Sequence, residues 1–446
     1  MSIELCDPVA CVAAGCTPAV CTGAGIPSNH ALFERSAAVI PGGVNSSIRA
    51  FKSVGGEPYV VARAEGAFVY DVEGREYVDL VQSYGAVILG HAHPAITAAL
   101  QAAAPDGTSY GAPTPREMKL AEAISARVPS CEQVRFMNSG TEATSTAVRL
   151  ARGYTGRDRV VIFHGNFHGA TDALLAAGGS GVATLGLPGT AGVPAGAVAE
   201  TLVVPYNVVP TLDDTVACVI VEPVAANMGV IPPAPGFLEG LRAECDRVGA
   251  VLVFDEVITG FRLGLAGAQG RYGVTPDLTT FGKVIGGGLP IGAVGGRREL
   301  METLTPLGTV FHAGTLAGNP LATAAGLAAL DNLDGDTYAF LEQQAARLAE
   351  VLGNACVAAG FAASFPVVGT LVGMVCGEVA QPTDFASAKR TDEAAFGRFF
   401  HAMLAEGVAM APGAYEAIFV GLAHTDDVLD RIAQAAHLAA RAALDS

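Results

Sequence analysis

The stretch "TTFGKVIGGGLPIGAVGG", residues 279–296, carries one charged side chain, Lys283, among apolar residues and seven glycines. The whole chain has only four lysines: Lys52, Lys119, Lys283 and Lys389. An ammonium on a long stem is costly to bury unless it is paired, neutralised or covalently used. Lys283 is therefore either a surface charge beside a glycine-rich turn or a lysine that takes part in chemistry, and the surrounding sequence has to decide.

Short apolar runs that end in polar residues or glycine lie on both sides of this stretch. They are "VRFMNSG" (134–140), "RVVIFHG" (159–165), "ACVIVEP" (217–223), "AVLVFDEV" (250–257) and "LTTFGK" (278–283). Helical patterns separate several of them, such as "TEATSTAVRLARGYTG" (141–156) and "PGFLEGLRAECDRVGA" (235–250). Buried strands that alternate with helices predict the α/β class with a mostly parallel sheet, which binds ligands at the carboxyl ends of its strands.

Four regions are predicted along the chain. Residues 1–29 form a Cys-, Ala- and Gly-rich N-terminal tail, and residues 30–75 form an N-terminal segment with a β-meander in "EPYVVARAEGAFVYDVEGREYVDL" (57–80). Residues 76–335 form the large domain, and residues 336–446 a smaller α+β domain with a long helix, strand-like runs and two terminal helices.

The composition excludes several classes of partner. Of 446 residues, 51% are hydrophobic and 15% are charged, and the formal net charge is −17. This charge argues against nucleic acid or an anionic membrane as the main partner. The uncharged stretch 351–376 is interrupted by Asn354, Pro366 and glycines, so buried strands and turns are expected there in place of a membrane span. The acidic start lacks a signal peptide's basic region, so a soluble, cytoplasmic protein is expected.

Nine cysteines are an odd count, and five of them stand in apolar contexts that suit reduced core thiols. The other four, Cys6, Cys11, Cys16 and Cys21, recur every fifth residue, without CxxC spacing or accompanying histidines. We expect a functionally silent tail there. His164 and His168 have the spacing of a metal pair but flank a glycine turn, so no metal site is expected.

Two further motifs accompany Lys283. "MNSGTEAT" (137–144) leads from a strand into a helix, where Ser139, Gly140 and Thr141 either hold a phosphate dianion or simply cap the helix. Asp255 ends an apolar strand and either pairs with a cationic ring nitrogen or caps a turn. Together the three features fit pyridoxal phosphate, which needs a phosphate cup, a carboxylate for its pyridinium nitrogen and a lysine for its aldehyde.

The order "NSGTEAT", "FHG", "FDEVITGFR", "FGKVIGGGLP", "GTLAGNP" closely resembles the class III aminotransferases of fold type I. More narrowly, "IPGGVNSSIRAFKSVGGEP" (40–58) and "YEAIFVGLAHT" (415–425) are similar to the glutamate-1-semialdehyde aminomutase branch of that family. The resemblance runs from about residue 31 to the C-terminus. It implies a large domain with a seven-stranded, mostly parallel sheet and a smaller C-terminal domain.

The resemblance also implies roles for individual residues. Lys283 would be the Schiff-base lysine and Asp255 the partner of the pyridine nitrogen. Further cofactor-binding residues would be Ser139, Gly140 and Thr141 at the phosphate, Phe167 and Val257 on the two ring faces, His168, Glu222, Asn227, and Thr315 from the second subunit of a homodimer. Substrate-binding residues would be Ser46, Arg49, Tyr84, Glu416, and Ser180 in a glycine-rich lid. An Arg suits a carboxylate substrate, because its planar fork donates two parallel hydrogen bonds.

The implied reaction is an amino transfer between adjacent carbons of one five-carbon substrate. Glutamate-1-semialdehyde would become 5-aminolevulinate, the tetrapyrrole precursor, and the cofactor would alternate between its pyridoxal and pyridoxamine forms. Departures from the family pattern cluster near the substrate: Ser47, Tyr84, Ala170, Ile258 and His312. Two alternatives therefore remain: an aminotransferase or paralogous aminomutase for another amino compound, and a non-catalytic pyridoxal phosphate sensor.

Overall fold

A seven-stranded sheet forms the centre of the computed structural model, which describes residues 27–176, 190–377 and 381–444. The strand order is β4-β10-β9-β8-β7-β5-β6. The bounds are β4 Gln133–Met137, β5 Arg159–Phe163, β6 Thr201–Val204, β7 Val216–Val221, β8 Val251–Asp255, β9 Leu278–Phe281 and β10 Gly292–Gly296. Only β10 runs antiparallel to its neighbours, β4 and β9. The expected α/β class with a mostly parallel sheet is confirmed.

Helices cover both faces of this sheet, and alternate residues of each strand point to opposite faces. In β7, Cys218 and Ile220 pack with the face covered by α5 (Gly140–Thr155). Val219 and Val221 pack with the other face, where α8 (Phe237–Val248) supplies apolar side chains. Because both faces are dry, these strands are almost wholly apolar, as the sequence pattern indicated.

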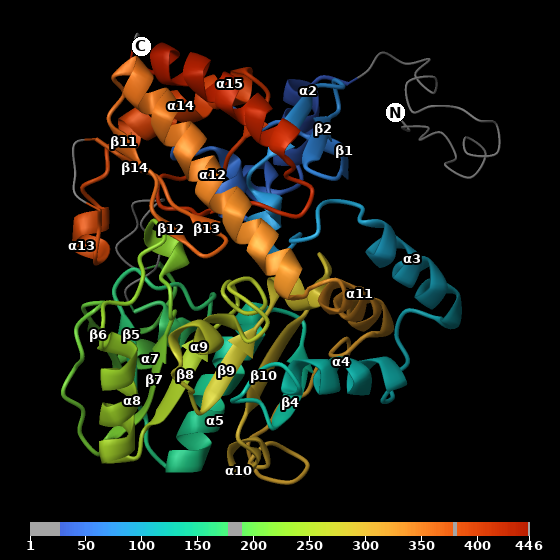
Figure 1. Cartoon of the computed structure of the whole chain (residues 1–446). Helices are drawn as coiled ribbons and strands as arrows, with labels where there is room; N and C mark the ends of the chain where they lie inside the picture. Colours follow the sequence, from blue (N-terminus) through green and yellow to red (C-terminus); the bar gives the residue numbers. More distant parts are fainter. Residues whose placement is uncertain (1–26, 177–189, 378–380, 445–446) are drawn as a thin grey trace.

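The other helices of residues 94–331 lie around the sheet. Their bounds are α3 Pro94–Ala103, α4 Pro115–Ser125, α7 Ala195–Val198, α9 Gly267–Tyr272, α10 Arg298–Met301 and α11 Pro320–Asp331. Figure 1 shows the green and yellow strands of the sheet in the lower part of the molecule.

Residues 29–79 and the C-terminal helices lie side by side in the upper part of the molecule (Figure 1). Helix α2 (Asn29–Ala37) precedes the expected meander, formed by β1 (Val61–Glu65), β2 (Phe68–Asp71) and β3 (Glu76–Asp79). Strand β15 (Val408–Ala409) adds to β3 in parallel, so the meander shares a sheet with the C-terminal residues. This pairing between distant segments is not visible in local sequence patterns.

Three long helices dominate the C-terminal residues: α12 (Gly335–Ala359), α14 (Glu393–Ala405) and α15 (Asp426–Ala442). The shorter elements there are α13 Phe385–Ala388, β11 Ala363–Ser364, β12 Val367–Val368, β13 Leu371–Val372, β14 Val375–Cys376 and β16 Ile418–Phe419. The expectation of strands and turns at 351–376 is wrong for its beginning, where α12 continues to Ala359. Among the described residues, no helix is long and apolar enough to cross a membrane.

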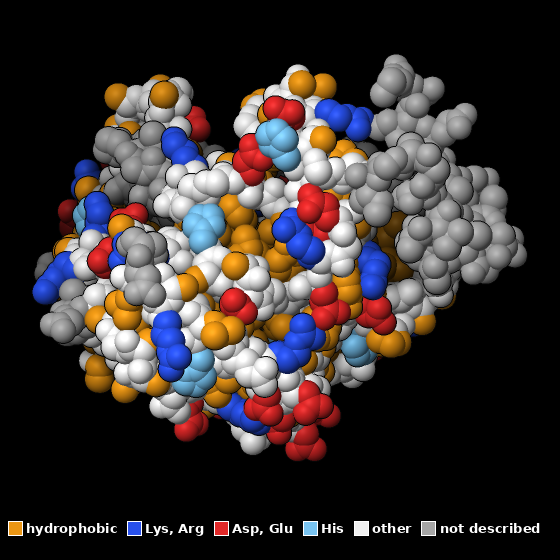
Figure 2. All heavy atoms as spheres, turned by 90° about the horizontal axis from the view of Figure 1, so that it is seen from above, with side chains coloured by type: hydrophobic (Ala, Val, Ile, Leu, Met, Phe, Trp, Pro, Cys, Tyr) orange, Lys and Arg blue, Asp and Glu red, His pale blue; other side chains and the backbone are white. Residues whose placement is uncertain are grey.

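The cysteines of the core and the charged side chains of the surface are distributed as the composition suggests. Cys131, Cys218, Cys245, Cys356 and Cys376 are buried free thiols, as expected. Figure 2 shows acidic and basic side chains interspersed over the face seen from above, with hydrophobic side chains gathered toward its middle. The four tail cysteines lie outside the described residues.

Candidate active site

The residues predicted to carry the chemistry follow the carboxyl ends of the parallel strands. Asp255 is the last residue of β8, and Lys283 comes two residues after the end of β9. These two strands are parallel neighbours in which Asp255 lies opposite Thr280. The register therefore brings Asp255 and Lys283 to one edge of the sheet although they are far apart in sequence.

The start of α5 forms a second part of the same edge. Ser139 is the N-cap of α5, and its hydroxyl accepts a hydrogen bond from the backbone N–H of Glu142 at 3.2 Å. Gly292 of β10 packs closely behind this turn: a Cβ at Gly292 would lie 2.1 Å from the carbonyl oxygen of Ser139. A helix N-terminus presents free N–H groups and a partial positive charge, which suits an anion.

One cavity of about 240 Å³ brings the expected cofactor residues together. Its lining includes Ser139, Gly140, Thr141, Phe167, His168, Glu222, Asn227, Asp255, Val257 and Lys283. Of the cofactor residues named from the sequence, Thr315 alone is absent from this lining; it is exposed elsewhere on the surface. The same cavity is also lined by residues that the sequence did not single out for the cofactor: Thr144, Gly169, Val224, Ile258 and Thr259.

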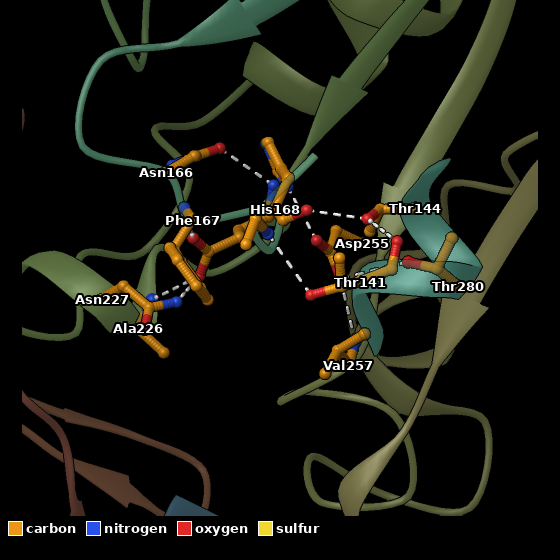
Figure 3. A network of polar contacts seen from close by, with 12 residues as sticks. Thr141, Thr144, Asn166, Phe167, His168, Ala226, Asn227, Asp255, Val257 and Thr280 are labelled. Carbon is orange, nitrogen blue, oxygen red and sulfur yellow. Dashed lines mark hydrogen bonds and ion pairs between the residues drawn. The ribbon is translucent and has the colours of Figure 1, made fainter. Parts of the chain in front are cut away.

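The carboxylate of Asp255 is buried and held from three directions (Figure 3). Its Oδ2 lies 2.7 Å from Nδ1 of His168. Its Oδ1 accepts hydrogen bonds from the hydroxyl of Thr280 and the backbone N–H of Val257, both at 3.1 Å. Each carboxylate oxygen has two lone pairs, so Oδ2 retains a site for a further donor.

Glu222 organises the opposite side of the cavity. Its Oε1 accepts from the backbone N–H of Phe167 at 2.5 Å, and its Oε2 accepts from the Nδ2 of Asn227 at 2.9 Å and the N–H of Ala226 at 3.1 Å. Burial raises the pKa of Glu222 to about 7, with a further contribution from the negative charge of Asp255 and opposing ones from His168 and the hydrogen bonds. This one carboxylate fixes both Phe167 and Asn227 at the cavity.

Lys283 is half-buried and adopts a left-handed backbone conformation, with φ of 49°. Burial lowers the pKa of its amine to about 8, although the carboxylates of Glu222, Asp255 and Glu416 raise it. Desolvation disfavours the ammonium form more than these three charges favour it. A neutral amine is the nucleophilic form of lysine, so this environment suits covalent use of Lys283.

The substrate residues named from the sequence lie partly in a second cavity. Arg49 and Tyr84 both line this space of about 450 Å³. Burial and the carboxylate of Glu416 raise the pKa of Tyr84, while Arg49 lowers it. Glu416 also raises the pKa of Lys283, so its charge acts on a residue of each cavity.

Two other substrate residues named from the sequence, Ser46 and Ser180, are not among the described residues that line these cavities. Ser46 is half-buried just before the short 3-10 helix Ser47–Ala50, and it lines neither cavity. Ser180 and its glycine-rich stretch lie outside the described residues. Among the described residues, no group of three or more His, Cys, Asp or Glu side chains is arranged to hold a metal ion.

Three supporting residues were missed in the sequence. Thr280 holds Asp255, Thr144 donates its hydroxyl to the carbonyl oxygen of His168 at 2.7 Å, and Asn166 accepts from the N–H of Glu222 at 2.9 Å. Thr280 could have been predicted, because it is a polar residue near the carboxyl end of β9, and Asp255 ends the neighbouring strand β8. Thr144 and Asn166 act through the backbone of other residues, which no sequence pattern reveals.

The residues present fit pyridoxal phosphate. The start of α5 suits its phosphate dianion, the Asp255 carboxylate suits a protonated ring nitrogen, and the Lys283 amine suits its aldehyde. Phe167 and Val257 line the same cavity and offer apolar surfaces for a flat ring. The Nε2 atom of buried His168 has no partner within the described residues, so a polar group belongs beside it.

Comparisons with known proteins agree with this site. The sequence profile of the family described as aminotransferase class-III matches residues 51–435. The chain is 52% identical over 410 residues to a glutamate-1-semialdehyde 2,1-aminomutase of Bordetella avium, covering 90% of this chain and 96% of that protein.

Solved structures share the fold. A transaminase with PLP bound is 33% identical, with a TM-score of 0.84 over 93% of this chain and 97% of that one. A glutamate-1-semialdehyde aminomutase from Pseudomonas aeruginosa PAO1 in complex with PMP is 25% identical, with a TM-score of 0.81 over 92% and 93% of the two chains. The chain belongs to the class III aminotransferase family of fold-type-I, pyridoxal phosphate-dependent enzymes.

Proposed function

We propose that this protein is an isomerase that converts glutamate-1-semialdehyde into 5-aminolevulinate by intramolecular amino transfer. The observation that carries the proposal is the single cavity lined by Lys283, Asp255 and the start of α5. The aminomutase of Bordetella avium, at 52% identity, supports the choice of reaction within the family. Substrate and product are isomers, so the reaction needs no second substrate.

The proposed cofactor is pyridoxal 5'-phosphate together with its pyridoxamine form. When bound, its conjugated ring accepts the electron pair of a bond broken at the amino-bearing carbon. Asp255 would keep the ring nitrogen protonated, and His168 and Thr280 keep that carboxylate in place. Ser139, Gly140 and Thr141 would hold the phosphate.

The ring would lie between Phe167 and Val257, which line the cavity together. Glu222 holds the backbone of Phe167 and the amide of Asn227, and would so fix the position of the ring. These contacts need no movement of the chain at the time of reaction, which is the purpose of a preorganised site.

Lys283 would hold the cofactor through its amine when substrate is absent. When substrate takes its place, the freed Nζ atom would carry protons to and from the substrate's adjacent carbons. Its pKa of about 8 supports this role, because the neutral base and the ammonium acid are both populated near neutral pH.

Arg49 would bind the substrate carboxylate, with Ser46, Tyr84 and Ser180 completing the pocket. The support for this assignment is that Arg49 and Tyr84 share one cavity and that Glu416 acts electrostatically on both Tyr84 and Lys283. The cation of Arg49 supplies the local positive charge that a chain of net charge −17 needs for an anionic substrate.

The wider setting is also a proposal. The protein would work as a homodimer in which Thr315 reaches the phosphate of the second subunit; Thr315 is exposed, which is compatible with that role. It would act in the cytoplasm, in synthesis of tetrapyrroles. Its domain division would be residues 30–75, 76–335 and 336–446 after the tail at 1–29. The boundary at 75 falls between β2 and β3, and β3 pairs with β15 of the C-terminal residues.

A single-substrate assay tests the proposal. Protein loaded with the pyridoxamine form is mixed with glutamate-1-semialdehyde alone, and 5-aminolevulinate is quantified by condensation to a coloured pyrrole. We expect many turnovers per active site without any added amino donor or keto acid. A strict requirement for a second keto acid, or release of no more than one product per site, would refute the aminomutase function.

The second candidate is an aminotransferase for another amino compound. Ile258 lines the cofactor cavity and Tyr84 the neighbouring one, and both depart from the aminomutase pattern. His312 and Thr141 line a shared surface depression close to the phosphate turn. A solved transaminase also resembles this fold at least as closely as a solved aminomutase does. Much faster turnover of a different amine with a keto acid would favour this candidate.

A further inference from the structure

Arg262 is a cation in the core that no ion pair explains. Its side chain is fully buried, and no carboxylate of the described residues forms an ion pair with it. It donates instead to backbone carbonyls: Nε and Nη2 to Gly85 at 3.2 and 2.8 Å, and Nη1 to Val420 at 3.0 Å. Its guanidinium carbon also lies 5.2 Å from the ring centroid of Phe419.

Burial of an unpaired guanidinium is costly, and it lowers the pKa of Arg262 to about 10. The group is still charged at neutral pH. Core packing alone would be served better by an apolar side chain of similar volume. The three hydrogen bonds that Arg262 donates therefore point to a role other than core packing.

These bonds hold a backbone turn that carries a substrate residue. Gln82, Ser83 and Tyr84 have φ values of 45°, 51° and 55°, three successive non-glycine residues in the left-handed region. Such residues do not adopt this conformation without external support. The turn lies against the 3-10 helix that begins at Lys283 and against β16.

The approach of Arg262 to this turn depends on a glycine. Gly85 has φ of 93°, and a Cβ there would lie 2.7 Å from the ring of Phe419 and 3.2 Å from Nε of Arg262. Any other residue at position 85 would push the guanidinium and the turn apart. The close contact therefore requires both a glycine at position 85 and the guanidinium of Arg262.

Arg262 is itself anchored from behind. The hydroxyl of Thr370 donates to the carbonyl oxygen of Arg262 at 2.9 Å, and the hydroxyl of Tyr338 donates to that of Phe261 at 2.8 Å. This segment follows Asp255 and Val257 along the chain. A fixed guanidinium thus links the cofactor side of the site with the turn of Tyr84.

We propose that Arg262 is a positioning residue for substrate binding, which fixes the Tyr84 turn against the segment that follows Asp255. Arg262 lines neither cavity. It holds the turn through its hydrogen bonds to Gly85, with Val420 as its other backbone partner, and its charge also lowers the pKa of Lys283. The identity of the substrate in this inference rests on the proposed function. The contacts of Arg262 with Gly85 and Val420 do not depend on it.

Two variants disturb this contact in different ways. Arg262→Lys keeps the charge but loses the planar fork that reaches two carbonyls at once. Gly85→Ala keeps Arg262 and pushes the turn away. Arg347→Lys is the matched control, because Arg347 makes a partly exposed ion pair on α12 with Asp430.

The KM for the amino substrate is the main measurement, with cofactor affinity from the absorbance of the bound cofactor as the second. We expect KM to rise roughly tenfold in Arg262→Lys and in Gly85→Ala, about the loss of one charge-assisted hydrogen bond. Cofactor affinity and kcat should change less than threefold, and the control should match the wild type.

A KM within twofold of the wild type in either folded variant would overturn the proposal. Unfolding of both variants would also overturn it, because the bonds would then serve global stability. The comparison stays informative if the proposed function is wrong: a wild type that needs a keto acid refutes the aminomutase reaction, and KM is then compared for the amine that it does use.

Discussion

Replacement of Gly292 by Ala tests whether the start of α5 holds a phosphate. The added Cβ would lie 2.1 Å from the carbonyl oxygen of Ser139 and 3.2 Å from the nitrogen of Gly140. A carbon and a carbonyl oxygen approach to about 3.3 Å at the closest. The two backbones must therefore separate by roughly 1 Å, because no flexible side chain can give way.

This displacement moves the N–H groups that would bind the phosphate. A hydrogen bond to a charged group contributes about 1.5–3 kcal/mol. Loss of one such bond raises the dissociation constant of pyridoxal phosphate about tenfold to a hundredfold. Overpacking also destabilises the fold by about 1–3 kcal/mol.

The assay is an absorbance titration of the cofactor-free protein with pyridoxal phosphate and, separately, with pyridoxal. The phosphate ester should lose more affinity than pyridoxal, because the start of α5 would bind the phosphate group that pyridoxal lacks. Gly335→Ala is the control, since Gly335 begins α12 and a Cβ there meets nothing within 4 Å. Equal loss of affinity for both ligands, or no loss in a folded variant, would refute the phosphate assignment.

Four shorter predictions follow from the same site. Lys283→Ala should abolish turnover, and borohydride should no longer attach the cofactor covalently, as mass spectrometry of the protein would show. Lys283→Gly should be at least as stable as Lys283→Ala in urea unfolding of the cofactor-free proteins, because glycine accepts the φ of 49°. Stopped-flow absorbance would measure the rate at which the cofactor-free wild type takes up the cofactor. This rate should rise with pH to a plateau, with a midpoint at about 8, because Lys283 loses its proton there. A midpoint above 10 would contradict the lowering of the Lys283 pKa by burial. Thr280→Val should weaken cofactor binding a fewfold, by about 1 kcal/mol, since it removes one hydrogen bond to Asp255.

The sequence predicts this site well because the chemistry follows strand ends. Apolar runs identify β4, β5, β7, β8 and β9 directly, and each is followed by residues that line the cofactor cavity. In a parallel sheet all those ends meet at one edge, so positions 139, 167, 222, 255 and 283 converge without any knowledge of tertiary contacts.

Strand β10 shows where that reasoning fails. Its sequence is Gly-Ala-Val-Gly-Gly, which has poor strand propensity. It forms a strand because β4 and β9 flank it and because side chains have no room there: Gly292 faces Ser139, Gly295 faces Cys131, and Gly296 faces Leu278. The need for glycine comes from neighbours distant in sequence, so local patterns do not predict the strand.

Part of the strained backbone lies near Arg262 and the cofactor cavity. Lys283, Tyr84 and Phe261 are non-glycine residues with φ of 49°, 55° and 55°, and each belongs to a segment beside Arg262 or the cofactor cavity. A left-handed conformation costs about 1–2 kcal/mol for each such residue, so the surrounding bonds must maintain it. A glycine at 283, 84 or 261 would remove that cost but also the amine, the phenol or the apolar ring. The protein retains these side chains, and hydrogen bonds from other segments stabilise the strained backbone: Arg262 donates to Gly85, and Tyr338 donates to Phe261. Arg262 ends the motif "FDEVITGFR", but the motif does not reveal its hydrogen bonds to Gly85 or the bond from Tyr338 to Phe261, and the structure adds these contacts.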